Sequence, residues 1–263
     1  LYTMIMITGG INMKYTAKYF KDNMPEWKRK KDAFVVQKFY RPLSFYGSSF
    51  AANHGISANT VSYFSVIVAI IGCILFLFDS KGLCICGAVL FSVWSWLDCV
   101  DGNLARSVRK QPFGEFADSM SSYILVGLMG SAMGIAAYNF GGTLLKPGNA
   151  WIILLGALAS SADSLMRLIY QKYKNTEKEL SEKGVLEIEN DLRKDHSKVG
   201  SFRVRIEETL GIGGILPLLI LLATIFNGLD LVIFYCFVYY GGSAVAVIII
   251  LATKAIKKAK LKY

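Results

Sequence analysis

Six apolar stretches, each long enough to cross a lipid bilayer as a helix, constrain the fold of this chain more than any other feature. They cover approximately residues 58–78, 83–105, 118–145, 151–170, 210–229 and 231–253. A helix needs about 20 residues to cross a hydrocarbon core of about 30 Å. Only 18% of the 263 residues are charged, against about 25% in soluble domains, which argues against a soluble enzyme. We therefore predict an all-α integral membrane bundle of six transmembrane helices.

The basic residues are unevenly distributed between the two ends of this bundle. Of the 29 Lys and Arg residues, 26 lie before residue 58, between the second and third stretches, in the charged loop 171–209, or in the basic tail 254–263. Loops rich in Lys and Arg stay on the cytoplasmic side. Both termini are therefore predicted to be cytoplasmic, in a bacterial cell membrane or, in a eukaryote, the endoplasmic reticulum. The net charge of +10 then reflects topology, and no nucleic-acid partner is expected.

The segment before the first stretch differs from the rest of the chain. Residues 1–12 precede Met13 and are interpreted as an upstream or cloning-derived stub. In residues 13–57, aromatic side chains are interleaved with Lys and Arg. This composition is typical of an amphipathic helix that lies at the headgroups of an anionic membrane surface. We expect the helix to bend at Pro42; the alternative is a solvated basic linker.

Carboxylates at membrane depth are rare and usually functional, and here they lie at the end of the second stretch and the start of the third. Asp98 and Asp101 are about one helical turn apart, and Asp118 lies on the next helix. Two neighbouring antiparallel helices would bring the three carboxylates together on the cytoplasmic side. Hard oxygen ligands without His or Cys favour Mg²⁺, Mn²⁺ or Ca²⁺. The alternative is that the acids only form ion pairs with Arg106 and Arg109.

Small residues accompany these acids. Gly102 and Ala105 follow on the same helix, and Gly114 precedes Asp118 by one turn. Their small size leaves room for a bulky ligand to approach the backbone. A metal held by carboxylates beside open space suits a diphosphate, because the cation neutralises phosphate charge and stabilises a leaving nucleotide.

The pattern resembles the signature of the CDP-alcohol phosphotransferase family, also called CDP-alcohol phosphatidyltransferases. This signature reads D-x-x-D-G-x-x-A-R, a spacer, and G-x-x-x-D-x-x-x-D. The matching positions are Asp98, Asp101, Gly102, Ala105, Arg106, Gly114 and Asp118. Residues 57–62 are also similar to the family's Pro-Asn-x-x-Thr entry segment, with Ala58 in place of Pro.

The resemblance implies a transferase that moves a substituted phosphate group from a CDP-alcohol, in the first place CDP-diacylglycerol, to an alcohol acceptor with release of CMP. It implies Mg²⁺ or Mn²⁺ as the cofactor, held by Asp98, Asp101 and Asp118. The residues that it assigns to the nucleotide and substrate are Asn59, Ser62, Asp98, Gly102, Ala105, Arg106 and Gly114.

The chain departs from the signature at the fourth acid, where Ser122 stands. In the family this acid is a metal ligand and the proposed base that deprotonates the acceptor hydroxyl, and serine fills neither role near neutral pH. Three interpretations follow: a natural variant that works without this base, an engineered inactivation, or a non-enzymatic protein that binds CDP-lipid. The spacer between the half-motifs has seven residues, about one fewer than is usual in the family.

Charged residues elsewhere offer candidates for the missing base and for the acceptor. Asp163 lies inside the fourth stretch, with Arg167 one turn further on. Asp163 is therefore either a substitute base or half of a structural ion pair. Arg167, Arg203 and Arg205 are candidates for binding an anionic acceptor, and the last two serve equally well as topology anchors.

A GxxxG pattern occurs in the third stretch, at Gly130 and Gly134. Such patterns let two helices approach closely. They serve either a homodimer or packing within one chain, and the sequence leaves both open.

Overall fold

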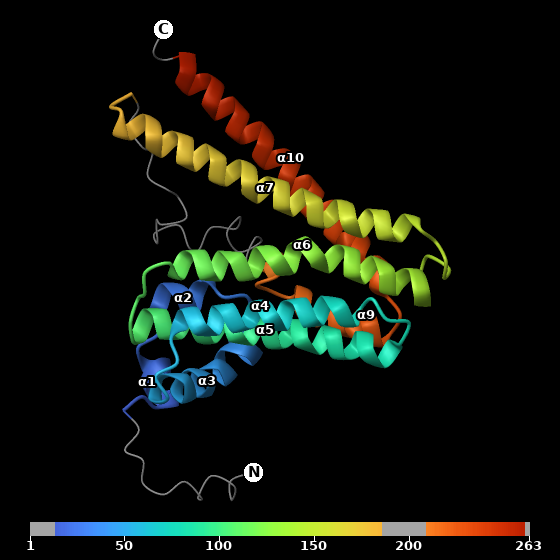
Figure 1. Cartoon of the computed structure of the whole chain (residues 1–263), viewed down its shortest axis with the longest axis horizontal. Coiled ribbons are helices and arrows are strands. Elements are labelled where there is room, and N and C mark those ends of the chain that lie inside the picture. Colours follow the sequence, from blue (N-terminus) through green and yellow to red (C-terminus); the bar gives the residue numbers. More distant parts are fainter. Residues whose placement is uncertain (1–13, 186–208, 261–263) are drawn as a thin grey trace, which may run out of the picture.

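The computed structural model describes residues 14–185 and 209–260, and every regular element within them is a helix (Figure 1). Three helices form the centre: α4 (Ala58–Leu75), α5 (Lys81–Ser107) and α6 (Gly114–Phe140). They run side by side in alternating directions, because short turns join them. The short helix α9 (Leu216–Ile225) packs against α5, while α7 (Trp151–Glu182) and α10 (Leu229–Lys260) pair with each other beside α6. The predicted all-α class is confirmed.

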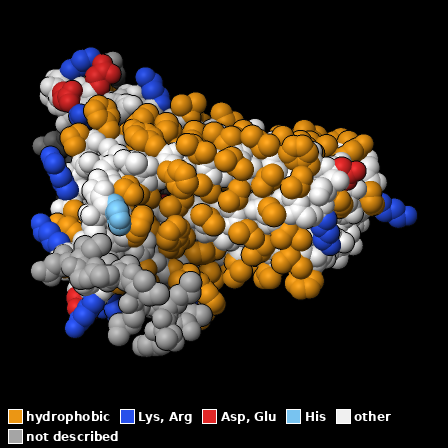
Figure 2. All heavy atoms as spheres, turned by 60° about the horizontal axis from the view of Figure 1, so that its bottom comes forward, with side chains coloured by type: hydrophobic (Ala, Val, Ile, Leu, Met, Phe, Trp, Pro, Cys, Tyr) orange, Lys and Arg blue, Asp and Glu red, His pale blue; other side chains and the backbone are white. Residues whose placement is uncertain are grey.

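Five described helices are long and apolar enough to cross a membrane, namely α4, α5, α6, α7 and α10. Figure 2 shows hydrophobic side chains over the long middle part of the molecule, as expected of an integral membrane protein. The fifth predicted span, 210–229, contains α9, which has only ten residues. At 1.5 Å per residue α9 is about 15 Å long, half of a hydrocarbon core. The count of six spans is thus not confirmed in the described part of the chain.

The backbone explains why α9 is short. Residues 211–215 form a turn in which the amide of Gly214 donates to the carbonyl of Gly211, and Pro217 lies in the first turn of the helix that follows. Proline lacks an amide hydrogen, so it suits a helix start and disfavours a helix interior. At the other end Asn227 has a left-handed φ of 56°. Hydropathy is continuous across these breaks and therefore does not reveal them.

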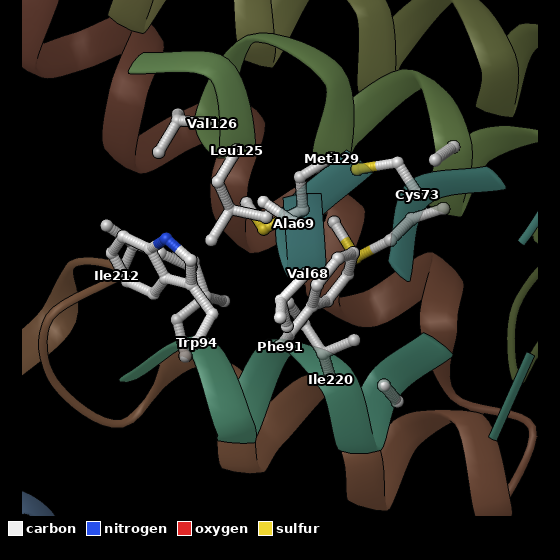
Figure 3. Close-up of a cluster of buried hydrophobic side chains, with 14 of the residues drawn as sticks. Val68, Ala69, Cys73, Phe91, Trp94, Leu125, Val126, Met129, Ile212 and Ile220 are labelled. Carbon is white, nitrogen blue, oxygen red and sulfur yellow. The ribbon is translucent and has the colours of Figure 1, made fainter. Parts of the chain in front are cut away.

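The hydrophobic core of the bundle fills the space between α4, α5, α6 and α9. Figure 3 shows Phe91 and Trp94 of α5 beside Leu125 of α6 and Ile220 of α9, all of them buried. The indole nitrogen of Trp94 donates to the hydroxyl of Ser121 at 2.8 Å, so its polar atom is satisfied inside the core. These contacts hold α5 and α6 in one register just beyond the acidic motif.

Glycines bring α6 and α7 into backbone contact. A Cβ atom at Gly130 would overlap the carbonyl oxygen of Gly156, and one at Gly134 would lie 2.8 Å from the Cα of Ile153. The hydroxyl of Ser160 accepts from the amide of Gly130 at 3.0 Å and donates to the Val126 carbonyl at 2.7 Å. The GxxxG pattern therefore serves packing within the chain.

A buried carboxylate fastens the opposite end of the bundle. Asp230, in the first turn of α10, is fully buried and accepts from the amides of Thr143, Leu144 and Leu145. Gly142 makes this possible, because a Cβ there would overlap the Asp230 carboxylate. The loop after α6 is thereby fixed to the start of α10.

The N-terminal helices lie at the end of the bundle where α5 ends and α6 begins (Figure 1). They are α1 (Ala17–Asp22), α2 (Glu26–Lys31), the π-helical turn η2 (Val36–Tyr40) and α3 (Arg41–Asn53). The π-turn ends two residues before Pro42, as expected where a proline removes one hydrogen bond from a continuing helix. Aromatic side chains on one face of this segment are largely exposed, including Phe34 at 68% and Tyr46 at 70%.

Helix α7 runs on to Glu182, beyond the predicted end of the fourth span at residue 170. Its extension packs against the end of α10, where Glu177 binds Lys258 at 2.7 Å and Lys174 at 3.0 Å. These ion pairs stabilise the helix across the first part of the predicted charged segment 171–209.

Candidate functional site

The acidic motif lies where the end of α5 meets the start of α6, beside the N-terminal helices (Figure 1). Asp98 and Asp118 interact through their carboxyl groups, and Asp101 lies within electrostatic range of both. Asp101 is 7% exposed and accepts a hydrogen bond of 2.6 Å from the hydroxyl of Ser62 on α4. Three helices thus bring the three predicted acids and Ser62 into one place.

Asp98, Asp101 and Asp118 fit a metal ion by the chemistry of their side chains but not by their present arrangement. Three carboxylates without His or Cys are the donor set that suits a hard divalent cation. In the described residues, however, no group of three or more His, Cys, Asp or Glu side chains is arranged as it stands to hold a metal ion. The Ser62 hydroxyl occupies one oxygen of Asp101. The donor chemistry of Asp98, Asp101 and Asp118 therefore fits a hard divalent cation.

The first turn of α4 closes one side of the motif. The side-chain amide of Asn59 donates to the Pro112 carbonyl at 2.9 Å, and its backbone amide donates to the side-chain oxygen of Gln111 at 3.3 Å. A Cβ at Gly114 would lie 3.4 Å from the Asn59 side-chain oxygen. Asn59 therefore holds the seven-residue turn between the half-motifs, in which Phe113 has a left-handed φ of 60°.

Gly102 gives Arg106 room to fold back along α5. A Cβ at Gly102 would lie 2.9 Å from both terminal nitrogens of Arg106. The guanidinium group donates to the side-chain oxygen of Asn103 at 3.3 Å and lies within electrostatic range of Asp98 and Asp118. Ala105 packs at the edge of the hydrophobic core. The Arg106 guanidinium thus lies next to the acids.

Ser122 lies one turn beyond Asp118 on α6 and is partly buried. Its hydroxyl donates to the carbonyl of Ser119 at 3.1 Å. The side chain is therefore bonded to its own helix. No carboxylate stands at the position where the family signature has its fourth acid.

Asp163, which is buried, forms an ion pair with the partly buried Arg167 on the same helix, and the Arg167 guanidinium lies 4.9 Å from the centre of the Tyr123 ring. The other carboxylate oxygen of Asp163 and the hydroxyl of Tyr240 are buried without a partner in the described part of the chain. These contacts fit the structural ion-pair interpretation. Arg203 and Arg205 lie outside the described residues.

The structure adds polar residues that the sequence did not single out. Asn103, inside the motif, and Arg41, on α3, are both buried and hydrogen-bonded to each other at 3.1 Å. Asp32 pairs with Arg41. Burial alone would raise the pKa of Asp32, but the charges of Lys28 and Arg41 hold it below its ordinary value. For Asn103, the sequence signal was its position within the acidic motif. Arg41 and Asp32 had no such signal, because they lie among the many charged residues of 13–57.

Comparison with known proteins bears directly on this arrangement. The sequence model of the CDP-alcohol phosphatidyltransferase family matches residues 56–236, which include α4, α5, α6 and α7 with the whole acidic motif. No curated protein matches the chain. The family match covers more than half of the sequence, and the chain belongs to the CDP-alcohol phosphatidyltransferase family.

Proposed function

We propose that this protein is a membrane transferase that moves a phosphoalcohol group from CDP-diacylglycerol to the hydroxyl group of an alcohol acceptor and releases CMP. Family membership supports the general reaction, a transfer from a CDP-alcohol within a membrane. The observation that carries the proposal is the convergence of Asp98, Asp101 and Asp118 beside Ser62 at one end of the bundle.

Asp98, Asp101 and Asp118 would hold Mg²⁺ or Mn²⁺. Such a cation neutralises the diphosphate and stabilises the departing CMP. Ser62 keeps the Asp101 carboxylate in place through its hydrogen bond. Arg106, folded over Gly102, would bind the phosphates of the CDP-alcohol through its positive charge. Gly114, beside Asn59, would leave space for the nucleotide.

In the transfer, the acceptor oxygen forms a bond to the phosphorus next to the alcohol of the donor, and the bond from that phosphorus to the oxygen of CMP breaks. The proton of the acceptor hydroxyl must leave. Ser122 does not take it, because a serine hydroxyl is not a base near neutral pH, and the Ser122 hydroxyl already donates to the Ser119 carbonyl. The second candidate function is therefore a catalytically impaired or non-enzymatic protein that binds CDP-lipid.

The Ser122→Asp variant is expected to release CMP faster than the unchanged protein, by about 10²-fold or more, because a positioned general base contributes about that much. The measurement is CMP release from CDP-diacylglycerol in nanodiscs with Mg²⁺ or Mn²⁺ and a panel of acceptors, including glycerol phosphate, inositol phosphate and serine. Ser119→Asp is the matched control, because it adds the same charge to the same helix at another position.

Other outcomes separate the two functions. Equal turnover by both proteins would show that position 122 needs no base, and loss of that turnover in Asp163→Asn would assign the base to Asp163. If neither the unchanged protein nor Ser122→Asp releases CMP, but CDP-diacylglycerol binding is retained, the result would support the non-enzymatic binder. Absence of both turnover and binding would overturn the proposed function.

The predicted topology belongs to the same proposal. The acidic motif and both termini face the cytoplasm, and the aromatic face of η2 and α3 lies in the headgroup region. The exposed side chains of Phe39, Leu43 and Phe50, each about 60% exposed, support this placement. With Gly130 and Gly134 packed against α7, the GxxxG pattern no longer supports a homodimer.

A further inference from the structure

A buried polar network links the N-terminal helices to the acidic motif. Arg41 and Asp32 are 5% and 7% exposed, and the Nε of Arg41 lies 2.8 Å from Oδ2 of Asp32. Lys28 binds the other oxygen of Asp32 at 2.9 Å. A buried carboxylate with both oxygens bonded to cations is held in a single orientation.

While the Nε of Arg41 binds Asp32, a terminal nitrogen of the same guanidinium group contacts helix α5. Its Nη1 donates to the side-chain oxygen of Asn103 at 3.1 Å and to the Cys99 carbonyl at 3.3 Å. Cys99 and Asn103 lie on either side of Asp101 and Gly102 in the sequence. Arg41 therefore contacts the motif helix at the turn that carries the acid.

Asn103 is shared between two arginines. Its side-chain oxygen also accepts from Nη2 of Arg106 at 3.3 Å, and its nitrogen donates to the hydroxyls of Ser44 and Ser48 on α3. Two guanidinium groups on one oxygen repel each other unless one is neutralised. Asp32 supplies the neutralising charge to Arg41, which lets Arg106 take its position over Gly102.

The packing between α3 and α5 keeps this network in register. A Cβ at Gly47 would lie 2.5 Å from the Trp96 ring and 3.0 Å from Val100. Helix α3 therefore lies directly on α5 at the level of the acids, with little freedom to slide.

We propose that Asp32 and Arg41 are positioning residues of the transferase, which orient Arg106 toward the phosphates of the CDP-alcohol through Asn103. The N-terminal segment is then part of the donor site as well as a membrane-surface element. This role rests on the proposed function.

The test measures the dissociation constant of CDP-diacylglycerol for the full-length protein in nanodiscs, which does not depend on turnover. Arg41→Lys keeps the charge but loses the forked donors, and Asp32→Asn keeps the shape but loses the neutralising charge. We expect each variant to weaken binding by at least about tenfold, which is the scale of one charge-assisted contact. Glu26→Gln is the control, because it removes the exposed ion pair between Glu26 and Lys30 on the same helix α2.

A double-mutant cycle separates positioning from general stability. In an Arg106→Ala background, Arg41→Lys is expected to have no further effect on the dissociation constant, because its effect acts through Arg106. An equal loss in both backgrounds would overturn the proposal, as would unchanged binding in folded Asp32→Asn, whose melting temperature serves as the folding check. Failure of the unchanged protein to bind CDP-diacylglycerol would instead overturn the proposed function, and the positioning role with it.

Discussion

Asp101→Asn is expected to lower the rate of CMP release by about 10²–10³-fold, the loss typical of removing one group that stabilises developing charge in a transition state. Asp101 is the most buried of the three acids and is held by the Ser62 hydroxyl at 2.6 Å. The amide keeps the size and the hydrogen bond but loses the charge needed to hold a divalent cation. The measurement is CMP release as a function of Mg²⁺ concentration, in the Ser122→Asp background if the unchanged protein is silent.

Two companions make this result specific. Asp79→Asn removes an acid from the turn between α4 and α5, at the other end of the bundle, and is expected to leave the rate unchanged. Ser62→Ala leaves the Asp101 carboxylate in place without its donor, so a smaller loss of about tenfold is expected. An Asp101→Asn protein that works at the full rate would remove Asp101 from the reaction.

Gly130→Ala is expected to destabilise the bundle by about 2–3 kcal/mol, because its Cβ would overlap the backbone of Gly156 and force α6 away from α7. For a protein of this size that corresponds to a fall of roughly 5–10 °C in melting temperature. The measurement is the apparent melting temperature of the purified protein in detergent, together with its oligomeric state by light scattering.

The matched control is Gly241→Ala in α10, where a Cβ meets nothing within 4 Å. This variant is expected to keep or slightly raise the melting temperature, since alanine favours helix more than glycine does. A Gly130→Ala protein with unchanged melting but a changed oligomeric state would mean that Gly130 serves contacts between chains rather than within one.

Much of the fold followed from local patterns in the chain. The starts of α4 at Ala58 and α7 at Trp151 coincide with the predicted stretches, because the length of an apolar run is a property of consecutive residues. Helical spacing also predicted that Asp98 and Asp101 share one face of a helix and that Asp118 on the next helix lies nearby. This prediction needs only the period of the helix and a short turn between the two helices. Helix α7 continues past the predicted end of its span at residue 170, and the predicted span 210–229 runs across the turn before α9, because ion pairs and glycine turns outweigh mean hydropathy there.

The order of residues alone predicted an all-helical membrane protein with a CDP-alcohol phosphotransferase motif and a serine at its fourth acid position. The apolar helices, the motif and the serine are each recognised from residues that are close together in the sequence. The folded chain was needed to show that Gly130 faces Gly156, that Asp230 binds the amides of a distant loop, and that Arg41, paired with Asp32, reaches Asn103. These contacts join residues between 9 and 87 positions apart. They form because buried polar groups need hydrogen-bond partners and because the packing of the helices fixes which of their faces meet. A pattern of consecutive residues specifies neither the partners nor the faces.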